Sequence, residues 1–146
     1  NWIPEDISLD ECVAKEGEVV EFCRSLNLYI FNLLITSYGQ DLKNEQWVME
    51  PCSNILISMS ILDTTIKRYI QGDESKKRDM LPVLRLSIAN QYDSMIAGSL
   101  EILAELGESK EVVLGWVEKL NYNPSKIQYK KQIYRDLDRY RKYYLD

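Results

Sequence analysis

The residues of this chain that could do chemistry are carboxylates, tyrosines, lysines and three cysteines, because the sequence contains no histidine. Histidine is the only side chain whose unperturbed pKa lies near neutrality. Its absence excludes nucleophiles activated by a histidine base, histidine-ligated zinc or di-iron sites, and histidine-bound haem. Glycine-rich phosphate loops are missing as well. We therefore expect a protein that is not an enzyme and that holds no cofactor and no metal.

Three glutamates, Glu101, Glu105 and Glu108, follow one another at about one helical turn. Paired carboxylates can hold a divalent cation or transfer protons. A cation site needs several converging ligands, and no Asp-rich loop accompanies these residues. We interpret them as an exposed helix edge, and an enzyme based on carboxylates or tyrosines is the least favoured hypothesis.

The cysteines Cys12, Cys23 and Cys52 form no C-x-x-C pair, and an odd number cannot be fully paired. Free thiols that pack as small apolar residues are typical of a reducing compartment. The chain shows neither a signal peptide at its start nor an apolar run of 18 residues. We predict an intracellular, cytoplasmic protein without a membrane span.

Charge is distributed unevenly along a chain whose net charge is −5. Residues 5–21 carry seven acidic side chains against one lysine, whereas residues 126–146 carry seven basic side chains against three acidic ones. The two regions either neutralise each other in the fold or form a bipolar surface that steers a partner. On the second interpretation, the candidate partner-binding residues are Trp2, Glu11, Glu16, Glu18, Lys130, Lys131, Arg135, Arg139, Arg141, Lys142 and Tyr143.

The last predicted helix is also rich in tyrosine, since six of the ten tyrosines fall within residues 122–144. Basic residues interleaved with aromatic ones can bind nucleic acid, and this is the second hypothesis for function. The overall acidity, with a pI near 4.9, opposes it. Helical spacing instead predicts that one stripe packs inward, formed by Tyr129, Ile133, Leu137, Tyr140 and Tyr144.

Apolar residues recur at intervals of three and four, which predicts an all-α protein with a single compact bundle of four to five helices in one domain, 1–146. Residues 1–8 form an irregular lead-in. A first helix starts near Ser8 or Asp10, is interrupted around Gly17, and ends at Gly39. The second covers 45–70, with Pro51 either in its first turn or after a separate turn. The third ends at Gly107 and is interrupted or restarted at Pro82.

A fourth helix follows Ser109, and we predict its inner face to be Val112, Val113, Trp116, Val117 and Leu120. The fifth, basic and tyrosine-rich, covers 125–144, with Asn123 as its N-cap. Trp47 and Trp116 are expected to anchor packing. The third helix carries a regular apolar seam from Leu81 to Leu106, which suits either an intramolecular bundle or a homo-oligomer.

These observations favour a non-enzymatic helical module that binds another protein, as an adaptor, regulator or inhibitor. Its charged surface would set the orientation of the partner.

Overall fold

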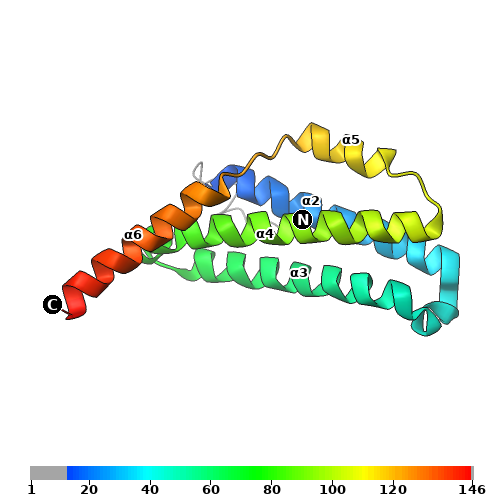
Figure 1. The fold of residues 1–146 in the computed structure, drawn as a ribbon, viewed down its shortest axis with the longest axis horizontal. Helices are drawn as coiled ribbons and strands as arrows, with labels where there is room; N and C mark the ends of the chain where they lie inside the picture. Colours follow the sequence, from blue (N-terminus) through cyan, green and yellow to red (C-terminus); the bar gives the residue numbers. More distant parts are fainter. Residues whose placement is uncertain (1–12, 146) are drawn as a thin grey trace.

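The computed structural model describes residues 13–145, and side chains as far as Lys142. It contains no strand in this range, which confirms the all-α prediction. Five α-helices and one 3₁₀ helix make up the described residues, labelled as in Figure 1. They are α2 (Ala14–Tyr38), the 3₁₀ helix η2 (Gly39–Asn44), α3 (Gln46–Gln71), α4 (Glu74–Leu106), α5 (Glu111–Leu120) and α6 (Lys126–Leu145).

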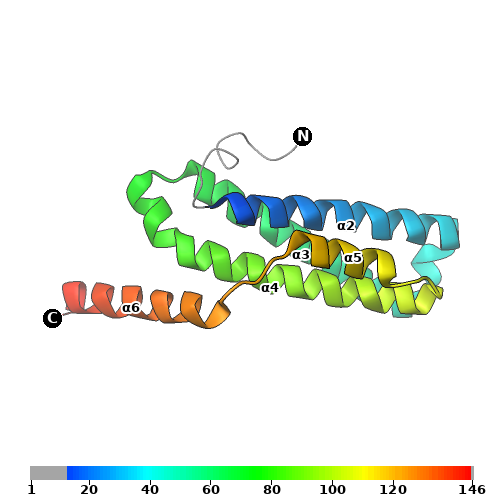
Figure 2. The ribbon, with the colours of Figure 1, turned by 90° about the horizontal axis from the view of Figure 1, so that it is seen from above.

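The core lies between α2, α3 and α4, three long helices that run side by side (Figures 1 and 2). The predicted seam of α4 is confirmed, because Leu84, Ile88, Tyr92, Met95 and Ile102 are all buried. The largest interface is that of α3 with α4. Gly98 allows these helices to approach closely, since a Cβ atom there would lie 3.2 Å from Cγ1 of Ile55. The core therefore depends on periodic apolar faces and on one small residue at a crossing.

Several helix ends agree with the sequence. Gly39 and Gly107 adopt positive φ angles of 56° and 70°, which glycine tolerates without a steric penalty. Asp73 caps α4, because its Oδ1 accepts a hydrogen bond from the backbone N–H of Lys76 at 2.9 Å. The hydroxyl of Ser109 accepts one from the N–H of Glu111 at 3.2 Å.

Three predicted interruptions are absent. Gly17 lies buried within α2, where the packing of neighbouring Val19 and Val20 outweighs a propensity cost of about 1 kcal/mol. Pro51 and Pro82 both lie inside continuous helices. Figure 2 shows that α4 bends over its N-terminal part, as expected where a proline removes a backbone hydrogen bond. The predicted start of the first helix at Ser8 or Asp10 lies outside the described residues.

The last two helices also differ from the prediction. Only Val113 of the predicted inner face of α5 is fully buried, and Val112 is exposed, because this short helix lies on the outside of the bundle. Asn123 is not the N-cap of α6, because the helix begins at Lys126 and Ser125 directly precedes it; the side chain of Asn123 donates instead to Oδ1 of Asn121 at 3.0 Å. The first helical hydrogen bond instead joins the N–H of Tyr129 to the carbonyl of Ser125.

One described segment, Ala14–Asn44, is long and apolar enough to resemble a membrane-spanning helix, with an 18-residue window of mean hydropathy 1.3. Length and composition alone do not distinguish such a span from the core helix of a globular bundle. One side of this segment packs against α3 and α4, through buried residues such as Leu26, Ile30 and Leu34.

Candidate partner-binding site

Helix α6 leaves the three-helix bundle and extends past its end, packing chiefly against the N-terminal part of α4 (Figures 1 and 2). Its seven basic and two acidic residues make it the most basic helix of the chain. A long helix packed on one side only must expose its other faces to solvent or to a partner. This helix is therefore the first place to look for a binding site.

The junction before α6 fixes the direction in which the helix leaves. Tyr122 packs edge-on against Tyr92 of α4, with ring centroids 5.0 Å apart. Burial and, to a smaller extent, the neighbouring Tyr129 raise the pKa of Tyr122. Lys126 pairs with Asp93 of α4, and Lys15 of α2 donates to the carbonyl oxygen of Leu120. These contacts clamp both ends of the α5–α6 connection to the bundle.

The apolar residues of α6 divide between two sides of the helix. Tyr129 and Ile133 are half-buried against α4, as predicted. Leu137 and Tyr140 are each 63 % exposed, so the expectation that they pack inward is wrong. The reason is geometric, because these two side chains border an open hollow between α6 and α4 instead of a packed contact. Ile127 and Tyr134, seven residues apart, are exposed as well.

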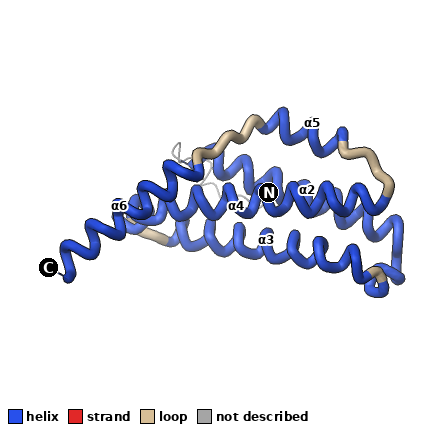
Figure 3. Tube along the Cα trace, viewed as in Figure 1, coloured by secondary structure: helices blue, strands red, loops and turns tan. Residues whose placement is uncertain are grey.

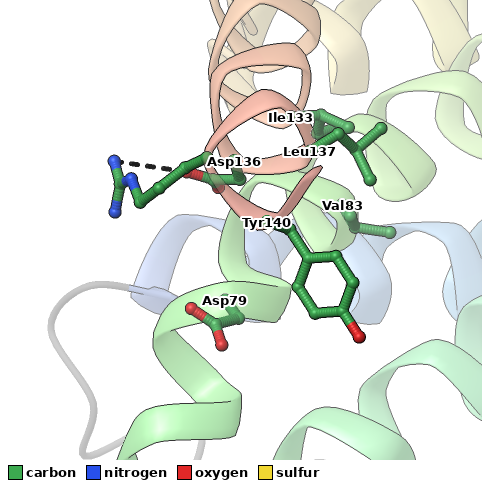
Figure 4. A pocket seen from close by; sticks show the side chains of 7 residues that line it. Asp79, Val83, Ile133, Asp136, Leu137 and Tyr140 are labelled. Atoms are coloured by element: carbon green, nitrogen blue, oxygen red, sulfur yellow. Dashed lines mark ion pairs between the residues drawn. The ribbon is translucent and has the colours of Figure 1, made fainter. Parts of the chain in front are cut away.

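A groove opens between α4 and the exposed flank of α6, with a volume of about 410 Å³. We call it the apolar groove. Figure 4 shows Ile133, Leu137 and Tyr140 of α6 facing Val83 and Asp79 of α4. Val83 is itself 51 % exposed. The groove therefore combines an apolar lining with polar groups at its edge, as in many sites that receive a side chain or small ligand.

A second hollow, with a volume of about 480 Å³, lies on the opposite flank of α6. Its α6 wall comes from residues such as Gln128, Gln132 and Arg135, which face away from the apolar groove. We call it the arginine cleft, because four arginines line it: Arg78, Arg85, Arg135 and Arg139. Asp79, Asp136 and Arg139 contribute to both hollows. The tube trace of Figure 3 shows that the α5–α6 loop leads into α6 near this region, whereas the α4–α5 loop lies at the opposite end of the bundle.

The predicted basic residues remain candidates. Lys130, Lys131 and Arg141 are exposed and have no ion pair within the described residues. Arg139 and Lys142 are also exposed, and each lies near an aspartate of the same helix, at 3.9 Å and 3.4 Å. Exposed pairs of this kind contribute little stability. The basic face of α6 is thus accessible.

The acidic candidates give a different result. Glu16 is buried, and its Oε1 accepts a hydrogen bond from Nε of Arg85 at 2.7 Å, so its prediction as a partner-binding residue is wrong. Its position on the inner face of α2 explains the difference. Glu18 is exposed and pairs with Lys15. Trp2, Glu11 and the side chain of Tyr143 lie outside the described residues.

The two oppositely charged regions do not neutralise each other in the part that the structure describes. Of the acidic region, Glu16 pairs with α4 and Glu18 pairs within α2. Of the basic helix, Lys126 pairs with α4, and the other ion pairs stay within α6. Among residues 13–142, no ion pair joins α2 to α6.

Other surfaces are weaker candidates. Trp47 does not anchor packing as expected, since it is 87 % exposed, and a smaller hollow beside it is lined by Glu101 and Glu105. Within the described residues no group of three His, Cys, Asp or Glu side chains is close enough to hold a metal ion. The thiols of Cys23 and Cys52 are free and buried, and burial raises the pKa of Cys23 to about 12, which makes it unreactive near neutrality.

Sequence reasoning missed the contribution of α4 to both hollows. Val83 and Asp79 lie off the buried seam of α4, and only the position of α6 makes them part of a groove. The sequence did carry a signal for the exposed side of α6, because Ile127 and Tyr134 are seven residues apart and do not belong to the stripe of Tyr129 and Ile133.

Comparison with models of known families, with characterised proteins and with solved structures finds no match to this chain. The geometry of the molecule therefore carries the functional argument.

Proposed function

We propose that this chain is a non-enzymatic interaction module that binds a partner protein through α6. One observation carries the proposal: a basic helix projects from the bundle, exposes Leu137 and Tyr140 in the apolar groove, and exposes Tyr134 on the same helix. Exposed apolar and aromatic residues grouped beside a groove are typical of interaction sites. Tyrosine and arginine are also among the side chains most enriched at interface hot spots.

The positive charge around this surface is complementary to an acidic partner. Lys130, Lys131 and Arg141 surround the exposed apolar residues and have no ion pair among residues 13–142. Complementary charge accelerates encounter and sets orientation, while the affinity comes from burial of the apolar residues. The partner would insert an apolar side chain into the groove and place its carboxylates against these cations.

Site-specific photo-crosslinking in the native host tests the proposal. A photoreactive phenylalanine analogue replaces Tyr134, and the matched control replaces Trp47, which is equally accessible at the other end of the bundle. We expect a discrete crosslinked protein from position 134 only. The variant Leu137→Asp should abolish that crosslink without unfolding the bundle. Equal crosslinking from both positions would contradict the proposal.

Charge reversal tests the steering role. Lys130→Glu combined with Lys131→Glu should slow association with the captured partner and reduce its dependence on salt. Lys43→Glu with Lys110→Glu is the matched control, because both residues are exposed and the segments that carry them, η2 and the start of α5, lie at the end of the bundle away from α6 (Figure 1). Unchanged association rates in the α6 variant would exclude this role.

Nucleic acid is the second candidate, favoured by the exposure of Tyr134 and Tyr140 on a basic helix. It requires an affinity that falls steeply with salt and decreases when Tyr134 is replaced by alanine. Absence of binding to single- and double-stranded probes at low salt would remove it.

A further inference from the structure

We propose that the arginine cleft is a binding site for a phosphate monoester. The cleft lies between the N-terminal part of α4 and α6, and four arginines line a volume of about 480 Å³. A volume of this size is typical of small-ligand sites. Because the cleft is on the opposite flank of α6 from the apolar groove, this inference does not depend on the proposed function.

One wall of the cleft is held in place by the bundle. Nε of Arg85 donates to the buried carboxylate of Glu16 at 2.7 Å, which joins α4 to α2. A hydrogen bond to a buried, charged acceptor restricts the rotamers of a long side chain. Arg85 therefore has a fixed position, as the supporting residue of a binding site requires.

The other arginines are available to a ligand. Arg78 and Arg135 are exposed and make no ion pair with any described residue. Arg139 has only a long pair with Asp136, at 3.9 Å, and its side chain is 80 % exposed. Like charges around one cleft repel one another, and a bound anion would offset that repulsion. The cleft thus concentrates positive charge on a chain whose net charge is −5.

The donors of the cleft match a phosphate group. The guanidinium group presents parallel N–H donors that bind phosphate oxygens in a bidentate manner. Gln128 and Tyr129, two further residues with hydrogen-bonding side chains, line the same cleft. A phosphate monoester carries about −1.5 to −2 charges and three acceptor oxygens at neutral pH, so it can engage several arginines at once. A single carboxylate can satisfy fewer of them.

The carboxylates in the cleft limit the choice of anion. Asp79 and Asp136 also line it, and Asp136 already accepts a hydrogen bond from Gln132 at 2.9 Å. With four arginines and these two aspartates, the lining carries a net charge that one compact dianion can balance. A nucleic acid strand running through the cleft would have to pass both carboxylates, which opposes nucleic acid as the ligand here.

The test uses isotope-labelled protein titrated with inorganic phosphate at constant ionic strength, with chloride as the reference anion. We expect saturable chemical-shift changes at amides of residues 78–85 and 128–139. Arg135→Ala combined with Arg139→Ala should weaken binding at least tenfold, and the lysine pair Arg135→Lys with Arg139→Lys should restore only part of it, because lysine lacks the bidentate fork. Lys43→Ala with Lys110→Ala removes the same charge at the opposite end of the bundle and should leave binding unchanged.

Two further arms identify the source of the phosphate. Tighter binding of a phosphoserine peptide than of inorganic phosphate would indicate a phosphorylated protein segment. Equal binding of free phosphoserine and the peptide would indicate a small phosphorylated molecule. Unsaturable shifts, equal binding by the alanine variant with its helicity intact, or preference for single-stranded RNA over every monoester would each overturn the proposal.

Discussion

Apolar residues are buried in the bundle of α2, α3 and α4, whereas several are exposed on the projecting helix α6. In the bundle, residues such as Leu26, Ile88 and Leu103 are completely buried. In α6, Tyr134, Leu137 and Tyr140 are each more than 60 % exposed. Both regions carry the same helical periodicity, so periodicity alone does not determine burial. What differs is whether another helix lies opposite the apolar face.

Charged residues show the same contrast. In the bundle, Arg85 pairs with the buried Glu16, and Arg24 pairs with Asp63 of α3 at 2.5 Å. On α6, most cations face solvent or an aspartate of their own helix. The bundle thus uses its charges to connect helices, whereas α6 keeps its charges available. This difference is what a scaffold with a separate binding element requires.

The largest effect we expect comes from comparing one apolar residue in each region. Ile88→Ala in the core should lower the free energy of unfolding by about 2–5 kcal/mol, because it removes a buried side chain and leaves a cavity. Leu137→Ala on α6 should change it by less than about 0.5 kcal/mol, as usual for exposed positions. Urea unfolding followed by circular dichroism measures both. Similar losses for the two variants would mean that α6 is part of the same packed core.

Much of the fold could be predicted from the sequence. The helical class, the buried seam around Ile88, and the helix ends at Gly39 and Gly107 were all correct, because each depends on local spacing or on backbone preference. The continuity of α2 through Gly17 and of α4 through Pro82 was not predicted, since tertiary packing there outweighs the low helix propensity of glycine and proline.

The candidate site was less accessible to sequence reasoning. The basic residues of α6 were identified, because their charge is visible in the sequence. The contributions of Val83, Arg78 and Asp79 were not, since they depend on where α6 crosses α4. Glu16 was misassigned as a surface residue because its partner, Arg85, is 69 positions away. Hollows formed by two helices require the packing angle, which residue spacing does not supply.

A second, intermediate effect concerns the charges of α2. Glu16→Gln should destabilise the protein by about 1–3 kcal/mol, because the guanidinium of Arg85 loses its buried anionic acceptor. Glu18→Gln, two residues away and exposed in its pair with Lys15, should change stability by less than about 0.5 kcal/mol. Thermal unfolding of both variants at low and high salt distinguishes the contribution of the buried pair from that of the exposed pair. Equal effects would show that the buried pair contributes no more than a surface pair.

The smallest effect tests how closely the helices approach one another. At Gly115 in α5 an added Cβ atom would meet nothing within 4 Å, so Gly115→Ala should stabilise the chain by about 0.5–1 kcal/mol through helix propensity alone. At Gly98 the added Cβ atom would lie 3.2 Å from Cγ1 of Ile55, at the α3–α4 interface. There the gain in propensity is opposed by overpacking, and we expect Gly98→Ala to be destabilising by about 1 kcal/mol or more. Chemical unfolding of both variants gives the comparison. A gain of stability at Gly98 would mean that Ile55 can move aside and that the α3–α4 interface accommodates a Cβ atom at this position.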